Sequence, residues 1–269
     1  MRDTRIHHRR FFVLAEHIRD GWVEFVPGQA RQMTQVLRLR PGDEVAIFDG
    51  TGREIVAALT TASPRRARAR ILREMPRTAP PVLSVTLAQV MPRGGAMDLV
   101  VGKATELGVS RIVPLEAERS VRRGIARDPR WRRIVQEAAE QCGRTDLPEL
   151  TPPLPLEAFL RGHPQGVPLV ACDPVEGSRP LVLVCQDLRN STRLTLLVGG
   201  EGGFSPSELE RLRVHGARLA SLGPRLLRAE TAALAALTIV QAILGDWGPG
   251  EGNWAGTRTV PGGGERVPA

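Results

Sequence analysis

From residue 82 onward, short apolar runs alternate with amphipathic stretches, and this alternation limits the possible fold more than any other feature. The runs VLSVTLAQV (82–90), RIVPLEA (111–117), VPLVACD, LTLLVGG and RLASLG have the length and composition of buried strands. The stretch GGAMDLVVGKATELG (94–108) is helical in pattern, with one apolar stripe made of Met97, Val100, Val101, Ala104 and Leu107. Because strands that alternate with helices form parallel sheets, we expect an α/β domain over residues 82–247.

Signals at the ends of helices support this prediction. Gly108 is a natural C-cap, and Asp128 should begin a helix over residues 128–144. Ser205 and Glu208 have the spacing of a capping box at the start of SPSELERLRVHG. The Ala-rich stretch TAALAALTIVQAILGDW should form the last helix.

Residues 1–75 have a different pattern, which predicts mainly strands. The runs RRFFVL, DEVAIFDG, REIVAAL and RARARILRE are separated in part by turn sequences. One helix, QARQMTQVLRLR, interrupts them with Met33, Val36 and Leu37 on one face. Short strands at close spacing predict a small barrel. The segment is dense in arginine, which suits a nucleic-acid platform, although the alternation in RARAR also fits the outer side of a strand.

Two segments have the composition of connections rather than of folded units. Residues 76–81 belong to a Pro-rich stretch and predict a linker. Residues 248–269 are rich in glycine and lack periodicity, which predicts a flexible tail.

Composition indicates the kind of partner and the compartment. The chain has 37 Lys and Arg residues against 29 Asp and Glu, and its formal net charge is +8. Such a surplus favours a polyanion such as nucleic acid, although a general preference for arginine would also produce it. The three cysteines, Cys142, Cys172 and Cys185, and the five histidines show no metal-binding spacing, so we expect no metal. The N-terminus lacks a signal peptide and the apolar stretch 232–244 is too short for a membrane span, which predicts a soluble, cytoplasmic protein.

The segment GGEGG (199–203) lies between a predicted strand and a predicted helix, which is where α/β sheets bind ligands. It lacks the lysine of a Walker loop, the G-x-G-x-x-G spacing fails at Ser205, and Glu201 would repel a phosphate. The loop therefore suits a ligand that is neutral or cationic near it and that contacts the backbone. A tight structural turn is the alternative.

A second segment, LGPRLLRAETAALAAL (222–237), also joins a predicted strand to a helix. The two loops can therefore form two walls of one pocket. Arg225 and Arg228 suit a substrate phosphate or an enolate-like uracil oxygen. The alternative is an ion pair of Arg228 with Glu230, whose charge is favourable at a helix N-terminus.

Together these two segments resemble the C-terminal signature of the SPOUT methyltransferases, and within them the RsmE-type enzymes that methylate uridine N3 in 16S ribosomal RNA. KATELGVSRIVPLEAERSV (103–121), EAAEQCGRTDLPEL (137–150) and VLRLRPGDEVAIFDGTG (36–52) are similar to further stretches of that family. The resemblance covers nearly the whole chain except the tail. Two positions depart from the family pattern: Gly200 replaces the usual proline of the loop, and Gln32 stands where relatives often carry histidine.

The resemblance implies a fold, a cofactor and partners. Residues 1–75 would form a PUA-like, RNA-binding β-barrel, and residues 82–247 a SPOUT domain with a deep trefoil knot. The cofactor would be S-adenosylmethionine, the partner 16S ribosomal RNA or the small ribosomal subunit, and the assembly a homodimer with the last helix at its interface. The expected cofactor-binding residues are Leu197, Val198, Gly199, Gly200, Glu201, Gly203, Leu222, Gly223, Leu227, Arg228 and Thr231. The expected RNA-binding residues are Arg9, Arg10, Arg38, Lys103, Glu106, Gln141 and Arg144.

The implied reaction also assigns catalytic roles. Uridine N3 must lose its proton before or during attack on the methyl group. Arg228 is the candidate for stabilising the resulting anion, and Glu201 or Glu230 for taking the proton. Anchoring of loop backbone is the alternative role of both carboxylates.

Two other functions remain open at the level of sequence. One is a SPOUT methyltransferase that acts on another RNA, and the other is a non-catalytic, RNA-binding ribosome assembly factor. A nucleotide-hydrolysing enzyme is disfavoured, because the glycine segment lacks the lysine and contains Glu201.

Overall fold

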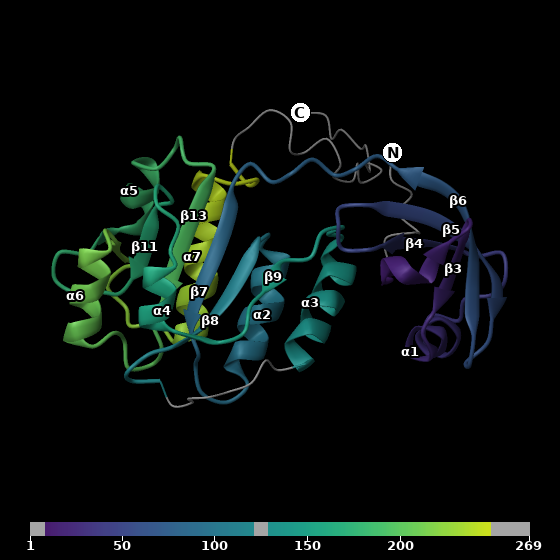
Figure 1. Cartoon of the computed structure of the whole chain (residues 1–269), viewed down its shortest axis with the longest axis horizontal. Coiled ribbons are helices and arrows are strands. Elements are labelled where there is room, and N and C mark those ends of the chain that lie inside the picture. Colours follow the sequence, from purple (N-terminus) through teal and green to yellow (C-terminus); the bar gives the residue numbers. More distant parts are fainter. Residues whose placement is uncertain (1–8, 121–128, 249–269) are drawn as a thin grey trace, which may run out of the picture.

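The computed structural model describes residues 9–120 and 129–248 of the chain. The described chain consists of an N-terminal sheet with one helix and a C-terminal α/β unit, which lie side by side (Figure 1). Residues 76–83 connect the two units without forming a helix or strand. Asp128, the expected N-cap, and all of the expected tail except Gly248 lie outside the described residues.

The N-terminal unit is a curled six-stranded sheet in the order β1-β4-β5-β6-β3-β2. Its strands are β1 (Arg10–Phe12), β2 (Ile18–Arg19), β3 (Trp22–Phe25), β4 (Glu44–Phe48), β5 (Glu54–Ala62) and β6 (Ala67–Met75). Neighbouring strands are antiparallel, except that β1 pairs with β4 in parallel. The four runs with a strand pattern form β1, β4, β5 and β6, whereas β2 and β3 come from stretches without such a pattern.

The helix of the N-terminal unit is shorter than the pattern predicted. It consists of α1 (Pro27–Arg31) and a π-helical turn over Gln32–Val36. Met33 is fully buried in the core of the sheet and Leu37 packs against that core, but Val36 is 72% exposed. The predicted apolar face is therefore wrong for Val36, because the wider π turn changes the direction in which that side chain points.

The alternation in RARAR places its two kinds of side chain on opposite faces of β6. Ala67 and Ala69 are buried in the core of the sheet, and Arg68 and Arg70 point outwards. Both guanidinium groups lie over the ring of Trp22 on β3, at 4.0 and 5.2 Å from its centroid. The structure thus agrees with the reading of this stretch as the outer side of a strand.

The C-terminal unit contains an eight-stranded sheet in which every strand pair is parallel. The order is β10-β8-β7-β13-β11-β14-β12, with β9 also paired to β8. The strands are β7 (Ser84–Val90), β8 (Arg111–Glu116), β9 (Glu149–Leu150), β10 (Leu154–Pro155), β11 (Leu169–Cys172), β12 (Arg179–Pro180), β13 (Arg193–Val198) and β14 (Arg218–Ser221). This arrangement confirms the predicted parallel α/β fold.

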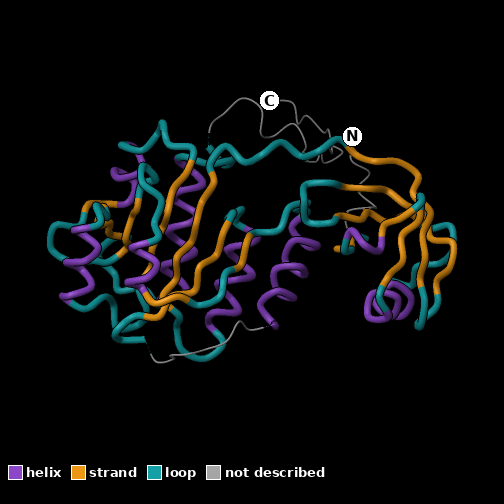
Figure 2. Tube along the Cα trace, in the orientation of Figure 1, coloured by secondary structure: helices purple, strands orange, loops and turns teal. Residues whose placement is uncertain are grey.

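Helices cover both faces of this sheet (Figure 2). One face packs against α2 (Ala96–Glu106), α3 (Pro129–Cys142), α5 (Leu181–Gln186) and α7 (Ala229–Ile243), and the other against α4 (Leu156–Arg161) and α6 (Pro206–Val214). Strand β13 serves both cores, because Leu196 and Val198 face the first layer and Leu197 faces the second. None of the helices in the described ranges is long and apolar enough to cross a bilayer.

The helix ends follow the sequence signals where they are described. Gly108 follows α2 with φ of +84°. The capping box of α6 is present, with Ser205 Oγ accepting from Glu208 N and Glu208 Oε2 accepting from Ser205 N at 2.8 Å. The predicted start of α6, directly after the glycine segment, is confirmed.

The two units contact each other through β1 and the region of α3. Arg10 of β1 forms a buried ion pair with Glu54 of β5, and its Nη2 donates to the carbonyl oxygen of Arg144 at 2.9 Å. Phe12 N donates to Glu140 Oε1 of α3 at 2.8 Å. Burial raises the pKa of the Glu140 carboxyl, and the hydrogen bond from Phe12 opposes that shift.

Candidate active site

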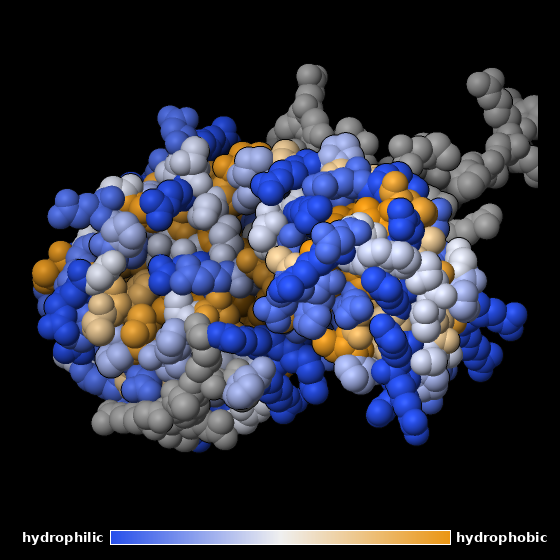
Figure 3. Space-filling view, turned by 45° about the vertical axis from the view of Figure 1, so that its right-hand side comes forward, coloured by the Kyte–Doolittle hydropathy of each residue, from blue (hydrophilic) through white to orange (hydrophobic). Residues whose placement is uncertain are grey.

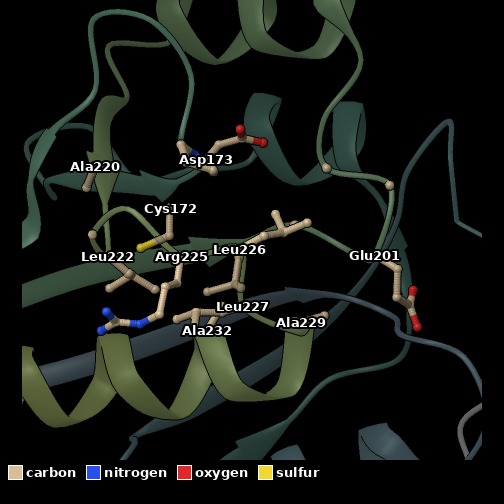
Figure 4. Close-up of a pocket in the computed structure, with 17 residues that line it drawn as sticks. Cys172, Asp173, Glu201, Ala220, Leu222, Arg225, Leu226, Leu227, Ala229 and Ala232 are labelled. Atoms are coloured by element: carbon tan, nitrogen blue, oxygen red, sulfur yellow. The ribbon is translucent and has the colours of Figure 1, made fainter.

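A cavity of about 240 Å³ lies at the carboxyl edge of the parallel sheet, where three adjacent strands end (Figure 4). The strands are β13, β11 and β14, and each contributes the segment that follows it. These segments are the glycine loop (residues 199–203), the β11 end (residues 172–174) and the β14–α7 loop (residues 222–228). Two of these three walls were predicted from the sequence, and the β11 end was not.

The glycine loop is packed so closely that a Cβ atom would be tight at three of its positions. A Cβ atom on Gly200 would lie 3.2 Å from Val90 Cγ1, and one on Gly202 would lie 3.2 Å from Arg119 Cβ. Gly203 has φ of +61°, and a Cβ there would lie 3.3 Å from Asp173 Oδ2. The loop therefore presents backbone to the cavity.

Two side chains, one from β7 and one from the segment after β8, fix the glycine loop. Gln89 at the end of β7 is fully buried, and its Nε2 donates to the carbonyl oxygens of Val90 at 2.8 Å and Gly199 at 3.2 Å. Arg119 Nη1 donates to the carbonyl oxygen of Gly202 at 2.8 Å. The start and the tip of the loop are thus both held by neighbouring segments.

Glu201 lines the cavity, but its carboxylate is turned away from the other labelled side chains (Figure 4). Its Oε1 accepts a hydrogen bond from Arg93 N at 2.7 Å. In this structure Glu201 connects the glycine loop to the segment between β7 and α2, which is the anchoring role that the sequence left as an alternative.

The β11 end brings Cys172 and Asp173 into the cavity. Burial raises the pKa of the Cys172 thiol to about 12, so the group is neutral at physiological pH. Asp173 is 8% exposed, and its Oδ2 accepts a hydrogen bond from Phe204 N at 3.2 Å. The signal for Asp173 was present in the sequence, since an aspartate directly follows the apolar run VPLVAC at the edge where the other loops lie.

The β14–α7 loop forms the apolar wall. Its lining residues include Leu222, Leu226 and Leu227, and α7 adds Ala229 and Ala232. Arg225 also lines the cavity, whereas Arg228 is the exposed N-cap residue of α7 and is not among the lining residues. Glu230 lies in the first turn of α7 beside the cavity and outside its lining.

The expected cofactor-binding residues divide into two groups. Those that line the cavity are Val198, Gly199, Gly200, Glu201, Gly203, Leu222, Gly223 and Leu227. Leu197 is fully buried and faces the opposite helical layer, because adjacent residues of a strand point to opposite faces. Arg228 and Thr231 are exposed at the start of α7.

The expected RNA-binding residues lie on both units, and several already have partners within the chain. Arg9 pairs with Asp43 at 3.2 Å, and Lys103 pairs with Glu106 at 2.8 Å. Arg10 is 5% exposed, and Arg144 donates to the carbonyl oxygens of Thr105 and Val109. Gln141 and Arg38 are exposed, and Arg38 has an unusual φ of +54°.

The chemistry of the lining restricts the ligand. Backbone of the glycine loop and leucine and alanine side chains surround the cavity. Its charged lining residues are Asp173, Glu201 and Arg225, so carboxylates outnumber basic side chains, and no lysine is among them. Such a lining suits a ligand with a flat apolar part and a positive charge better than a phosphate. The described residues contain no group of His, Cys, Asp and Glu arranged to hold a metal ion.

Comparison with known families gives separate matches for the N-terminal and the C-terminal unit of the chain. Residues 78–241 match the family model of the RNA methyltransferase domain, and residues 29–72 match that of the RNA methyltransferase PUA domain. The first match includes all three walls of the cavity, and the second covers β4, β5 and most of β6 of the N-terminal sheet.

Individual relatives match over most of their length. The ribosomal RNA small subunit methyltransferase E of Synechocystis is 31% identical over 87% of this chain and 78% of its own. The protein of that name from Mycobacterium bovis is 34% identical over 79% of this chain and 83% of its own. Among solved structures, ribosomal RNA small subunit methyltransferase E from Neisseria gonorrhoeae bound to S-adenosyl methionine has a TM-score of 0.81 at 32% identity, covering 89% of this chain and 99% of that one. A putative methyltransferase from Legionella pneumophila with bound SAM has a TM-score of 0.78 at 31% identity, covering 88% and 98%. The chain therefore belongs to the RNA methyltransferase family, with a PUA domain ahead of its methyltransferase domain.

Proposed function

We propose that the protein transfers a methyl group from S-adenosylmethionine to N3 of a specific uridine in 16S ribosomal RNA. One observation carries the proposal: the cavity at the carboxyl edge of the sheet combines glycine backbone, apolar side chains and two carboxylates against one arginine, without a lysine in its lining. This combination fits a cofactor that has a flat base, a positive charge and no phosphate. The names of the matched relatives and their SAM-bound structures support the class of reaction and of RNA.

We assign cofactor binding to the glycine loop and the β14–α7 loop. Backbone groups of residues 199–203 would contact the cofactor, and Leu222, Leu226 and Leu227 would bury its base. Leu197, Arg228 and Thr231 would support these loops from outside the cavity lining. The cofactor supplies a methyl group that its sulfonium already activates, so the protein has to position the uridine and manage its proton.

The residues at the cavity rim are the candidates for that task. Loss of the N3 proton leaves a negative charge on the uracil oxygens, which an arginine can stabilise. Arg228 at the start of α7 is the candidate, and Arg225 within the cavity lining is the residue to compare it with. Glu230 and Glu201 are the candidates for the proton acceptor, although the carboxylate of Glu201 already binds Arg93 N.

The N-terminal unit would bind the RNA. Its outward-facing side chains are predominantly hydrophilic on the face shown in Figure 3. Arg38 is the most accessible of the expected contacts there, since it is exposed while Arg9 and Arg10 have acidic partners. We propose the division into residues 1–75 for RNA binding, 76–81 as linker, 82–247 for catalysis and 248–269 as tail, with the knot in the second unit.

We further propose that the protein works as a homodimer in the cytoplasm, where ribosomal subunits are assembled. The outer face of α7 carries Thr231, Ala235, Thr238 and Ala242, which are exposed or half-buried and recur at helical spacing. Leu226 next to it is 89% exposed. Small side chains beside an exposed leucine allow close approach of a second copy. Sedimentation of Ala235→Arg, compared with the unaltered protein, measures whether this face of α7 forms the dimer interface.

Labelled S-adenosylmethionine and small ribosomal subunits that lack the modification test the function. We expect label in 16S RNA at one uridine, mapped to N3 by mass spectrometry. Arg228→Ala should abolish the transfer while sparing most of the cofactor affinity. Arg225→Ala tests the other arginine for the same role, and Glu230→Gln tests the proposed proton acceptor. Label in another RNA would reject the proposed target, and absence of cofactor binding in calorimetry would reject the enzyme.

A further inference from the structure

Asp173 differs from the other charged residues of the cavity in being buried without a basic side chain bonded to it. The residue is 8% exposed, and among the described residues its side chain accepts one hydrogen bond, from Phe204 N to Oδ2. Oδ1 accepts no hydrogen bond from the residues that the structure describes, yet it is not enclosed by protein. Asp173 is one of the residues that line the cavity, which leaves Oδ1 available to a ligand there.

The surroundings hold this carboxylate in place. Asp173 N donates to the carbonyl oxygen of Ala220 at 3.0 Å, and Ser178 Oγ donates to the carbonyl oxygen of Asp173 at 2.7 Å. The left-handed backbone of Gly203 brings the glycine loop against Oδ2. Figure 4 shows the carboxylate extending from the β11 end toward that loop, above Leu226.

We propose that Asp173 is the anionic group that pairs with the positive charge of the cofactor, and thereby a specificity-determining residue of this site. The inference rests on the proposed function, because S-adenosylmethionine has two cationic groups, its sulfonium and its ammonium. A carboxylate with one oxygen fixed by the backbone and the other facing a cavity is preorganised for such a partner.

The second carboxylate of the lining does not have this position. Glu201 is exposed, and its carboxylate is directed out of the cavity onto Arg93 N. Asp187→Asn removes the same formal charge at an exposed carboxylate that pairs with Arg179 and is not among the lining residues, which makes it the matched control. Asp173→Asn is nearly isosteric and keeps an oxygen for the Phe204 N–H.

Stability gives an independent readout. Burial raises the pKa of the Asp173 carboxyl, while the hydrogen bond from Phe204 N and the charge of Arg119 lower it. A carboxyl whose pKa is raised by folding destabilises the ligand-free protein when it is ionised at neutral pH. Asp173→Asn should therefore raise the melting temperature of the ligand-free protein, whereas loss of a purely structural anchor would lower it.

Calorimetry with three ligands tests the proposal on the full chain. These are S-adenosylmethionine, S-adenosylhomocysteine, which lacks the sulfonium charge, and methylthioadenosine, which lacks both cationic groups. We expect Asp173→Asn to weaken S-adenosylmethionine binding by about tenfold or more, as for loss of a hydrogen bond to a charged group, and to leave methylthioadenosine binding unchanged.

The outcomes show which cationic group Asp173 pairs with. They also separate a failure of this inference from a failure of the proposed function. A loss confined to S-adenosylmethionine assigns the sulfonium to Asp173, and an equal loss for S-adenosylhomocysteine assigns the ammonium. Equal changes for all three ligands, no change, or the same effect in Asp187→Asn would overturn the inference. If the unaltered protein fails to bind S-adenosylmethionine, the proposed function fails instead.

Discussion

At Gly203, both the backbone conformation and the missing side chain affect the cavity. Its φ of +61° is unfavourable for other residues, and a Cβ atom would lie 3.3 Å from Asp173 Oδ2. We expect Gly203→Ala to lower the free energy of unfolding by about 1–2 kcal/mol and to weaken cofactor binding, because the carboxylate has to shift. Urea unfolding and calorimetry measure the two effects.

Gly216 provides the control for this prediction. Its φ is +73°, and a Cβ atom there would have nothing within 4 Å. Gly216→Ala should therefore cost a similar free energy of unfolding and leave cofactor affinity unchanged. Equal affinity in both variants would show that the contact between Gly203 and Asp173 has no influence on the cavity.

The residues of the candidate site differ in how well the sequence predicted them. The glycine loop was predicted because clustered glycines after an apolar run are a local signal, and its position at the sheet edge is confirmed. Asp173 had no local signal apart from its place after a strand. Asp173 lies beside the glycine loop, about 30 positions further along the chain, because β11 is placed between β13 and β14 in the sheet. The periodicity of the sequence does not reveal this strand order.

At the scale of the elements, the hydrogen bonds at the N-terminus of α6 should make the stability of the protein depend on pH. Hydrogen bonds from serine hydroxyls, that of Ser205 first, and from Arg211 lower the pKa of the Glu118 carboxyl to about 2. Glu118 Oε1 accepts from Ser207 Oγ at 2.8 Å and from Arg211 Nη2 at 2.6 Å. Glu118 thus ties the segment after β8 to the helix that follows the glycine loop.

The sign of the pH effect follows from the lowered pKa. The contribution of Glu118 to stability is fully present above its ordinary pKa of 4.5 and is lost as the pH falls toward 2. We expect the unfolding free energy to fall more steeply over this range in the unaltered protein than in Glu118→Gln. Urea titrations at several pH values test this, and because the carboxylate is exposed, salt should reduce the difference. Parallel pH profiles of the two proteins would contradict the prediction.

Length and capping decided which elements could be predicted. Helices α2, α6 and α7 have sustained apolar stripes or a capping box, and the sequence located them. Helices α4 and α5 have six residues each, fewer than two full turns, so no helical period distinguishes LVLVCQ from a strand. Strand β3 was missed for the related reason that its four residues are too few to establish an alternation.

At the scale of the whole molecule, the sequence predicted the two units but not the contact between them. Arg10 was expected to bind RNA because it lies in a basic segment. The structure instead places its side chain at 2% exposure, paired with Glu54 and bonded to the backbone of Arg144 in the other unit. A basic residue on a strand gives no sign of which face it occupies until the partner strand and the neighbouring unit are known.

Arg10→Ala should therefore act on stability before it acts on RNA binding. Removing the guanidinium breaks the buried ion pair between Arg10 and Glu54, and breaking such a pair from one side typically costs about 3–5 kcal/mol. Arg9→Ala is the matched control, since the adjacent pair with Asp43 is about one-third exposed on both sides and should contribute less than about 1 kcal/mol. Urea unfolding measures both, and hydrogen exchange along β1 and α3 shows whether the two units separate first. If Arg10→Ala kept its stability and lost RNA affinity, the residue would belong to the RNA surface and the contact between the units would have to rest on Phe12 and Glu140.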